Sequence, residues 1–275
     1  MSYHRPTDLA SALSLASEAP QVVIAGGTDV FPAMQQGQGF NSVLDLTAVP
    51  ELCGIEQSDS GIRIGAAARW SDLVRADLPT AFDGLKQAAR QVGSVQIQNA
   101  ATLAGNLCNA SPAADGVPPL LTLEASVEVA SAARGARLVP LDGFILGVRK
   151  TALRPDEIMT GLVIPSPPPT AGSCFEKLGS RTYLVISIAM VSALVVTDEE
   201  GRITLARIAV GACSAVAQRL RRLEVSCLGK RPEDVTVTAE HLADLTPIDD
   251  VRGSAAYRRD VVGELCLRAL KGAAG

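Results

Sequence analysis

Two polar, glycine-containing segments hold most of the residues whose types and spacing suit chemistry. The first, AGGTD, starts at Ala25 and directly follows a short apolar run. Glycines let backbone amides approach an anion closely, and the following threonine adds a hydroxyl donor. This pattern indicates a phosphate-binding turn, with a plain tight turn as the simpler alternative, because it matches neither the G-x-G-x-x-G fingerprint nor the P-loop.

The second segment, TLAGNLCNASPAAD, runs from Thr102 to Asp115 and contains almost no large apolar residue. It combines the small residues Ala104 and Gly105 with a hydroxyl, two amides and a carboxylate, namely Ser111, Asn106, Asn109 and Asp115. A carboxylate among small polar residues suits the hydroxyls of a ribose or ribityl chain. A surface loop held by its own side chains is the alternative, but two such segments in one domain favour a shared ligand.

Other catalytic constellations are poorly represented. His4 lies near the N-terminus and His241 in a predicted helix, and neither belongs to a metal-binding or triad pattern. The six cysteines are widely spaced, without a C-x-x-C pair, and are predicted to be buried free thiols rather than zinc or iron–sulfur ligands. A nucleotide-binding protein without its own bases and nucleophiles leaves the chemistry to its cofactor.

The elements that must position these segments mix strands and helices without a regular βαβ repeat. An amphipathic helix with Thr7 as its cap opens the chain, and a second helix has Ser71 in a capping position. The pattern further predicts strands at 22–25, 42–47, two around the turn 59–61 and one at 157–165, and helices at 70–78 and 81–94. Residues 119–131 are predicted to form a helix followed by a strand.

The segment IPSPPPTAGS, residues 164–173, is the clearest linker signal because it clusters four prolines with a glycine and three hydroxyl residues. We place the domain boundary there: a first domain at 1–168, with subdomains of about 1–55 and 56–168, and a second at 172–275. The second domain is predicted to be a small α+β unit. Its three strands are expected at 175–180, 186–198 and 203–213, and its helices at 215–229, 238–245 and 254–270.

Composition excludes several function classes. The net charge is −4 and the basic residues are scattered, which argues against nucleic acid as a partner. The longest apolar run, 186–196, is about half of the roughly 20 residues that span a bilayer. Because the N-terminus also lacks a secretory pattern, we expect a cytoplasmic protein without membrane insertion.

The segments AGGTDVFPAM and VGSVQIQNAATLAGNLCNASPAADGVPPLL together resemble the FAD-binding medium subunit of the molybdenum hydroxylases. That family includes xanthine dehydrogenases and carbon monoxide dehydrogenases. The resemblance continues in the same order through DEIMTGLVIP, FEKLGSRTYLVISIAMVSA and RGSAAYRRDVVGELCLRAL, and so covers essentially the whole chain. It implies an α+β fold: a p-cresol methylhydroxylase-type FAD-binding domain of two α/β subdomains, followed by a small C-terminal flavoprotein domain.

The resemblance also implies which residues bind the cofactor. Asn109 and Asp115 match positions that contact the ribityl or ribose part, Met159 an apolar position near the flavin, and Lys177 a lysine that closes over the cofactor. The FAD diphosphate would be held by the first segment and the second, that is by Ile24, Ala25, Gly26, Gly27, Thr28, Asp29 and Val30, and by Thr102, Leu103, Ala104, Gly105 and Asn106. Two positions depart from the family: Ala104 replaces a glycine, and Val185 stands where many relatives have an aspartate.

The function implied is that of an electron-transfer subunit of an oxidoreductase. FAD in this chain would take electrons from the 2Fe-2S clusters of a small partner subunit and pass them to NAD+, a quinone or oxygen. A large partner subunit with a molybdopterin cofactor would hydroxylate the substrate, and the whole would assemble as a dimer of heterotrimers. Two alternatives stay open: a stand-alone flavin reductase or oxidase of the same fold, and a flavin-free scaffold subunit.

Overall fold

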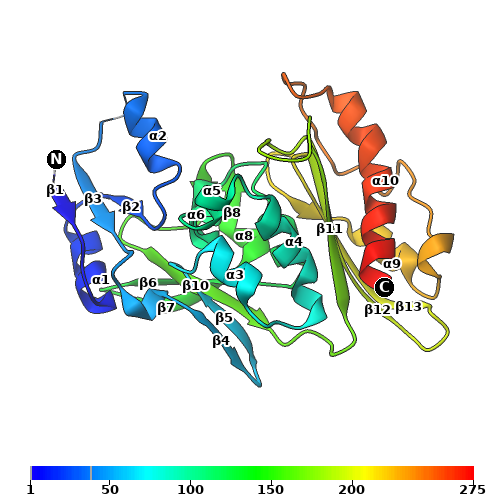
Figure 1. Ribbon diagram of the computed structural model, residues 1–275, viewed down its shortest axis with the longest axis horizontal. Helices are drawn as coiled ribbons and strands as arrows, with labels where there is room; N and C mark the ends of the chain where they lie inside the picture. The colour runs from blue at the N-terminus through cyan, green and yellow to red at the C-terminus, as the bar shows by residue number, and fades with distance from the viewer. Residues whose placement is uncertain (1, 38) are drawn as a thin grey trace.

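The computed structural model describes residues 2–37 and 39–275 and arranges three main sheets along the length of the molecule (Figure 1). A small parallel sheet forms the N-terminal end, a five-stranded antiparallel sheet the centre, and another antiparallel sheet the C-terminal end. Helices pack on all three sheets, which is the expected way to bury their apolar faces. The predicted α+β fold class is therefore confirmed.

The N-terminal sheet positions the first glycine-containing segment. Its strands lie in the order β1-β3-β2 and cover Ser2–His4 (β1), Val22–Ile24 (β2) and Ser42–Asp45 (β3), with helices α1 (Leu9–Glu18) and α2 (Val30–Gln35) between them. The prediction of Thr7 as the cap of α1 was wrong: the Asp8 carboxylate accepts a hydrogen bond from the Ser11 N–H at 2.8 Å. The glycine turn leaves the carboxyl end of β2, the edge of a parallel sheet where ligands commonly bind.

The central sheet has the strand order β4-β5-β10-β6-β7 and carries most of the helices of the first domain (Figure 1). Its strands are β4 (Ile55–Ser58), β5 (Gly61–Gly65), β6 (Ser126–Ser131), β7 (Gly135–Pro140) and β10 (Ile158–Pro165). The helices are α3 (Trp70–Arg75), α4 (Asp83–Gln91), α5 (Val95–Gln98), α6 (Leu103–Asn109), α7 (Val117–Thr122) and α8 (Leu141–Phe144), and a short hairpin of β8 (Ile145–Gly147) and β9 (Lys150–Thr151) follows. The predicted strand pair around residues 59–61 is confirmed, whereas β7, β8 and β9 were not predicted.

Two local predictions in this region need correction. Ser71 does not cap α3: Arg69 occupies the N-cap position, and Ser71 is buried inside the first turn. The second polar segment is not a loop throughout, because residues 103–109 form helix α6. Thr102 is its cap, and the Thr102 hydroxyl accepts a hydrogen bond from the Gly105 N–H at 3.0 Å.

Hydrogen bonds to the Glu157 carboxylate connect the edge strand β7 to the start of β10. Its carboxylate receives two hydrogen bonds from the Arg137 guanidinium, Nη2 to Oε2 at 2.7 Å and Nε to Oε1 at 2.9 Å, and a third from the Arg154 N–H. These donors favour the ionised form, so the hydrogen bonds from Arg137 lower the pKa of Glu157 from its ordinary 4.5 to about 2.

This lowered pKa predicts a specific acid sensitivity. A carboxyl group with a depressed folded-state pKa stabilises the protein above its unfolded pKa and loses that contribution as the pH falls toward the folded value. Compared with Glu157→Gln, the wild type should be more stable by roughly 2 to 3 kcal/mol at pH 7, and the difference should vanish between pH 4.5 and 2. Urea unfolding of both proteins across this range measures it, and a difference that does not change with pH would contradict the assignment. Glu56→Gln, on exposed strand β4, is the control.

The C-terminal domain is a sheet in the order β11-β12-β13-β14 with the long helix α10 packed on it (Figure 1). Its elements are β11 (Gly172–Leu178), β12 (Ala189–Thr197), β13 (Ile203–Gly211), β14 (Gln218–Arg219), α9 (Arg221–Cys227) and α10 (Ala255–Ala274). The three predicted strands are confirmed, and the two-residue β14 extends them. The predicted helix at 238–245 was wrong, because the hydrogen bonds there connect residues three apart and form successive turns.

Alternate residues of β12 explain why both domains pack on the C-terminal sheet. Val191, Ala193 and Val195 lie in the apolar core shared with α10, whereas Leu194 belongs to the core of the first domain. Because successive side chains of a strand point to opposite faces, the sheet is covered on both sides, and its central strand becomes a continuous apolar run. Helices α4 and α7 of the first domain pack on the face opposite α10.

Two further expectations concern the chain as a whole. The prediction of buried thiols holds for Cys174, Cys213, Cys227 and Cys266 but is wrong for Cys53 and Cys108, which are exposed. Within residues 2–37 and 39–275, no helix is both long and apolar enough to cross a membrane.

Candidate functional site

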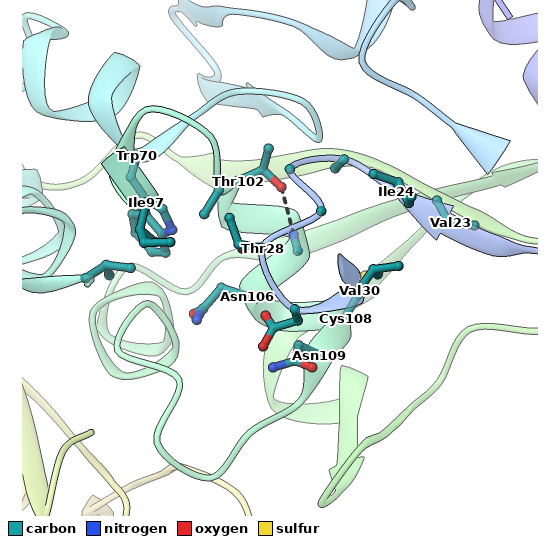
Figure 2. A pocket seen from close by; sticks show the side chains of 17 residues that line it. Val23, Ile24, Thr28, Val30, Trp70, Ile97, Thr102, Asn106, Cys108 and Asn109 are labelled. Carbon is teal, nitrogen blue, oxygen red and sulfur yellow. Dashed lines mark hydrogen bonds between the residues drawn. The ribbon is translucent and has the colours of Figure 1, made fainter. Parts of the chain in front are cut away.

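The two glycine-containing segments meet around one cavity of about 400 Å³, the central cavity (Figure 2). The first segment comes from the turn between β2 and α2, and the second from helix α6 and the residues before it. The cavity is lined by Val23, Ile24, Ala25, Gly26, Gly27, Thr28, Asp29, Val30, Trp70, Val92, Ile97, Ala101, Thr102, Gly105, Asn106, Cys108 and Asn109. Two segments about 75 residues apart in the sequence therefore form opposite walls of a single site.

The glycines are required by how closely the two segments approach. A Cβ atom on Gly26 would lie 2.3 Å from the Ala100 carbonyl oxygen and 2.7 Å from the Ala101 Cα, both backbone atoms directly before the second segment. Gly27 has a φ of +69°, and a Cβ there would lie 2.3 Å from the Phe31 ring. Gly26 therefore allows the backbone of the turn to contact residues 100–101, and Gly27 allows a positive φ that side chains disfavour.

The turn offers a row of unused hydrogen-bond donors to the cavity. Among the hydrogen bonds of residues 2–37 and 39–275, none is donated by the backbone N–H groups of Gly26, Gly27, Thr28 or Asp29. The Thr28 hydroxyl likewise has no partner among these residues. Since backbone donors are almost always paired in folded proteins, consecutive free N–H groups beside a cavity indicate an anion receptor.

The opposite wall contributes amide side chains. Asn106 accepts a hydrogen bond from the Gly116 N–H through its Oδ1 at 3.2 Å, which leaves its Nδ2 as a donor. Within the described part of the chain the Asn109 side chain also has no partner. Figure 2 shows both amides below Thr28, on the α6 side of the cavity. They can bind hydroxyl, carbonyl or phosphate oxygens.

One end of the cavity is apolar, and sequence reasoning missed it. Trp70 at the start of α3, Val92 after α4 and Ile97 in α5 form this end. Figure 2 shows Trp70 beside Ile97 and across the cavity from Val23 and Ile24. No local signal in the sequence identifies this end, because its residues come from separate elements. An apolar end of a cavity suits an aromatic ring system.

A more open groove of about 840 Å³ continues from the central cavity on the α2 side. It shares Asp29, Val30 and Asn109 with that cavity and is also lined by Arg149, whose guanidinium donates to the Asn109 carbonyl at 3.4 Å. Because the two spaces share part of their walls, a ligand too long for the cavity alone can extend into the groove.

The predicted site residues divide into two groups. Those that line the central cavity are Ile24, Ala25, Gly26, Gly27, Thr28, Asp29, Val30, Thr102, Gly105, Asn106 and Asn109. Those that lie outside its walls are Leu103, Ala104, Met159, Asp115 and Lys177. Leu103 and Ala104 pack in the apolar core of the first domain, and Met159 is buried behind α6, its sulfur 3.7 Å from the Cys108 thiol.

Ala104 is accommodated without changing the cavity. It lies in helix α6, is not among the residues with positive φ, and its methyl group is buried in the core. The face of α6 that meets the cavity is formed instead by Gly105, Asn106 and Asn109. The departure from the family glycine therefore falls on the side of the helix that faces away from the site.

Asp115 joins the two domains through a buried cluster. Lys177 of β11 donates to Asp115 Oδ2 at 2.6 Å, and Ser187 donates to Oδ1 at 2.6 Å. All three side chains are buried. Burial raises the pKa of the Asp115 carboxyl, and the Lys177 ammonium opposes that rise. Ser187, which sequence reasoning missed, completes the set of partners, so both carboxylate oxygens are bound by the C-terminal domain.

The cluster is connected to the cavity wall. Gly116, next to Asp115, donates to Asn106 Oδ1, and a Cβ atom at Gly116 would lie 2.7 Å from the Trp70 ring. Asp115 thus acts on the cavity through its neighbour, although its carboxylate does not line it. Among residues 2–37 and 39–275, the ionisable groups on the cavity wall itself are the Asp29 carboxyl and the Cys108 thiol. This wall is built for binding and offers little acid–base chemistry.

Comparison with known families matches both domains. Residues 1–167 match the family described as the FAD binding domain in molybdopterin dehydrogenase, and residues 175–273 match the CO dehydrogenase flavoprotein C-terminal domain. The chain is 31% identical to the xanthine dehydrogenase FAD-binding subunit of Escherichia coli O157:H7, over 95% of this chain and 91% of that protein. It is 34% identical to the nicotinate dehydrogenase FAD-subunit of Eubacterium barkeri, over 89% of this chain and 83% of that protein.

A solved structure supports the same relationship. The chain superimposes on carbon monoxide dehydrogenase from Hydrogenophaga pseudoflava with a TM-score of 0.89 and 27% identity, over 99% of this chain and 96% of that one. The agreement covers both domains and the junction between them. The family matches, the relatives and the shared fold lead to one conclusion: this chain belongs to the FAD-binding medium subunits of the molybdenum-containing dehydrogenases.

Proposed function

We propose that this chain binds FAD without a covalent bond in the central cavity and relays electrons within a molybdenum hydroxylase complex. The observation that carries the proposal is the close approach of the two glycine-containing segments, together with residues 26–29, which line the cavity and whose N–H groups have no partner among the described residues. The donors fit a diphosphate, the amides of Asn106 and Asn109 fit sugar or ribityl oxygens, and the apolar end fits a ring.

The predicted residues that do not line the cavity have a proposed supporting role: they hold the residues that do line it. Asp115 and Lys177 hold the domain junction and the peptide that binds Asn106. Met159 supports α6 from the central sheet, and Leu103 and Ala104 anchor that helix in the core. Asp29 carries a negative charge, so it suits a hydroxyl donor of the ligand rather than a phosphate.

FAD, when bound, supplies the reversible uptake of electrons and their release to an acceptor. The side chains of this chain bind it, fix its orientation and exclude water from the apolar end. The scarcity of acids and bases on the cavity wall favours this role over a reaction catalysed by side chains. NAD+, a quinone and oxygen all remain candidate acceptors under this proposal.

The proposal extends to partners by analogy with the relatives, which are subunits of xanthine, nicotinate and carbon monoxide dehydrogenases. A small subunit with 2Fe-2S clusters would donate the electrons, and a large subunit with the molybdopterin cofactor would oxidise the substrate. We propose a dimer of heterotrimers as the assembly.

Titration of the flavin-free full chain with FAD is the primary test. Retention of the flavin absorption bands through gel filtration supports the proposal, and protein that retains no flavin at saturating FAD contradicts it and favours the scaffold alternative. Turnover with NADH and artificial acceptors is then compared between the isolated chain and the chain reconstituted with its partner subunits. Full turnover by the isolated chain would favour the stand-alone reductase instead.

Thr28 allows a sharper test of the diphosphate site. Thr28→Val keeps the shape of the side chain but removes the hydroxyl donor, and a hydrogen bond to a charged oxygen contributes enough that the dissociation constant for FAD should rise about tenfold or more. Isothermal titration calorimetry measures this constant. Thr236→Val, at an exposed position of the C-terminal domain, should leave it unchanged. Unaltered FAD affinity in Thr28→Val would show that the hydroxyl does not contact the ligand.

A further inference from the structure

Trp70 is buried but its indole N–H has no acceptor. The residue is 1% exposed, and within residues 2–37 and 39–275 no hydrogen bond uses its Nε1. Buried tryptophans normally pair this N–H with an acceptor, since leaving it unpaired in the core is unfavourable. The unpaired donor therefore needs a physical explanation.

The N–H is not enclosed in the core. The buried side-chain nitrogen and oxygen atoms that lack a partner in the described part of the chain are Gln21 Oε1 and Arg258 Nε, and Trp70 Nε1 is not among them. The ring instead forms part of the wall of the central cavity. In Figure 2 its nitrogen lies on the side that faces Thr28 and Asn106. The donor is thus directed into the cavity.

Packing against neighbouring backbone fixes the position of the Trp70 ring. A Cβ atom on Gly116 would lie 2.7 Å from Trp70 Cη2, so the peptide after Asp115 packs directly on the indole. The backbone N–H of Trp70, as distinct from its indole N–H, donates to the Ala101 carbonyl at 3.2 Å, which connects the start of α3 to the residue before the second glycine-containing segment. With backbone and ring both held, the indole cannot turn its Nε1 toward another protein acceptor without losing this packing.

The surroundings of Nε1 define the acceptor it would meet. The neighbouring wall residues Val92 and Ile97 are apolar and offer no competing polar atom. The anion-binding donors of the glycine turn lie on the other segment, at Gly26 to Asp29. A single neutral donor on the wall opposite that turn suits the carbonyl oxygen or ring nitrogen of a planar heterocycle better than a phosphate, which the four N–H groups of the turn can bind.

We propose that Trp70 is a cofactor-binding residue whose indole Nε1–H donates a hydrogen bond to a ring oxygen or nitrogen of the bound dinucleotide. This inference rests on the proposed FAD function of the central cavity and adds a specific contact to it. Both halves of FAD present such acceptors, the flavin through its carbonyl oxygens and ring nitrogens and the adenine through its ring nitrogens. The separate halves used as probes distinguish them.

The single tryptophan makes the contact directly observable. A ¹⁵N-labelled full chain has one indole N–H resonance, because the sequence contains one tryptophan. Saturating FAD should move that proton resonance downfield, as a new hydrogen bond requires. FMN and ADP, added separately, identify the half that supplies the acceptor: movement with either one supports the proposal. Movement with inorganic pyrophosphate alone would overturn it, since the acceptor would then be a phosphate.

Trp70→Phe tests the same contact through affinity. The variant keeps an aromatic ring but lacks the donor, so the dissociation constant for FAD should rise about fivefold to tenfold. Phe144→Leu is the matched control: it also shortens a fully buried ring of the first domain, but away from the cavity, and should leave FAD affinity unchanged. Thermal unfolding of both flavin-free variants reports the loss of packing separately.

The outcomes separate this inference from the proposed function. If the wild type retains no FAD, the proposed function fails. If the wild type binds FAD but its indole resonance stays in place at saturation, or Trp70→Phe binds FAD as the wild type does, only the assignment of Trp70 is overturned. If Phe144→Leu weakens FAD binding as much as Trp70→Phe, the effect is one of general packing, and the assignment is overturned as well.

Discussion

A Gly26→Ala variant is expected to lose FAD binding almost completely while the chain stays folded. The added methyl group would lie 2.3 Å from the Ala100 carbonyl oxygen, so the turn and the second segment must separate. The donors at residues 26–29 then no longer face α6 at the right distance. Loss of two hydrogen bonds to a charged diphosphate corresponds to an increase in the dissociation constant of at least about a hundredfold. Calorimetric titration with FAD measures it.

Gly143→Ala is the matched control for this prediction. Gly143 lies in α8 of the same domain, and nothing lies within 4 Å of a Cβ built there. Circular dichroism should show both variants folded, because overpacking at one site typically destabilises a protein by only about 1 to 3 kcal/mol. If Gly26→Ala bound FAD with an affinity near that of Gly143→Ala, the close contact of the two segments would have no role in cofactor binding.

The sequence predicted the cavity lining best where glycines and small polar residues carried the signal. The turn at residues 25–30 and the polar face of α6 could be recognised because few other residue types tolerate such a close approach of two backbones. The helical form of residues 103–109 was missed, since a segment of amides and small residues has little apolar periodicity. Thr102 is the N-cap of this helix, and the sequence pattern did not identify it as a cap.

The apolar end of the cavity could not be predicted, because it depends on tertiary contacts. Trp70, Val92 and Ile97 come from three separate helical segments, and each follows the ordinary pattern of a core residue. Their convergence is produced by the packing of α3, α4 and α5 against one another. The same limit applies to Ser187, whose role depends on Asp115, 72 residues away in the sequence. Local patterns contain no information on such distant partners.

The second large effect is expected at the domain junction. Lys177→Met removes the ammonium group that pairs with Asp115 and leaves a buried carboxylate held only by Ser187 and its surroundings. Breaking a buried ion pair by removing one partner typically destabilises a protein by about 3 to 5 kcal/mol. The decrease in unfolding free energy can be measured with urea. Lys150→Met, at an exposed position on β9, should change it by no more than about 0.5 kcal/mol.

The pH dependence of the unfolding free energy of Lys177→Met shows whether the buried Asp115 carboxylate causes the destabilisation. Burial already raises the pKa of Asp115, and without Lys177 only the hydrogen bond from Ser187 opposes that rise. An acid whose folded-state pKa lies above its unfolded value stabilises the folded protein as the pH falls, because the folded state binds the proton more tightly. The difference in unfolding free energy between Lys177→Met and the wild type should therefore be largest at neutral pH and decrease under mildly acidic conditions.

A double variant separates the buried charge from lost packing. Asp115→Asn combined with Lys177→Met removes both charges, and its amide oxygen can still accept the hydrogen bond from Ser187. Replacing both members of a buried ion pair by neutral groups destabilises a protein much less than leaving one buried charge without its partner. The double variant should therefore be more stable than Lys177→Met alone at pH 7. Equal stability of the two would mean that Lys177 acts through its aliphatic chain. Gly116, next to Asp115, donates a hydrogen bond to Asn106 on the cavity wall. The double variant should therefore also bind FAD more tightly than Lys177→Met does.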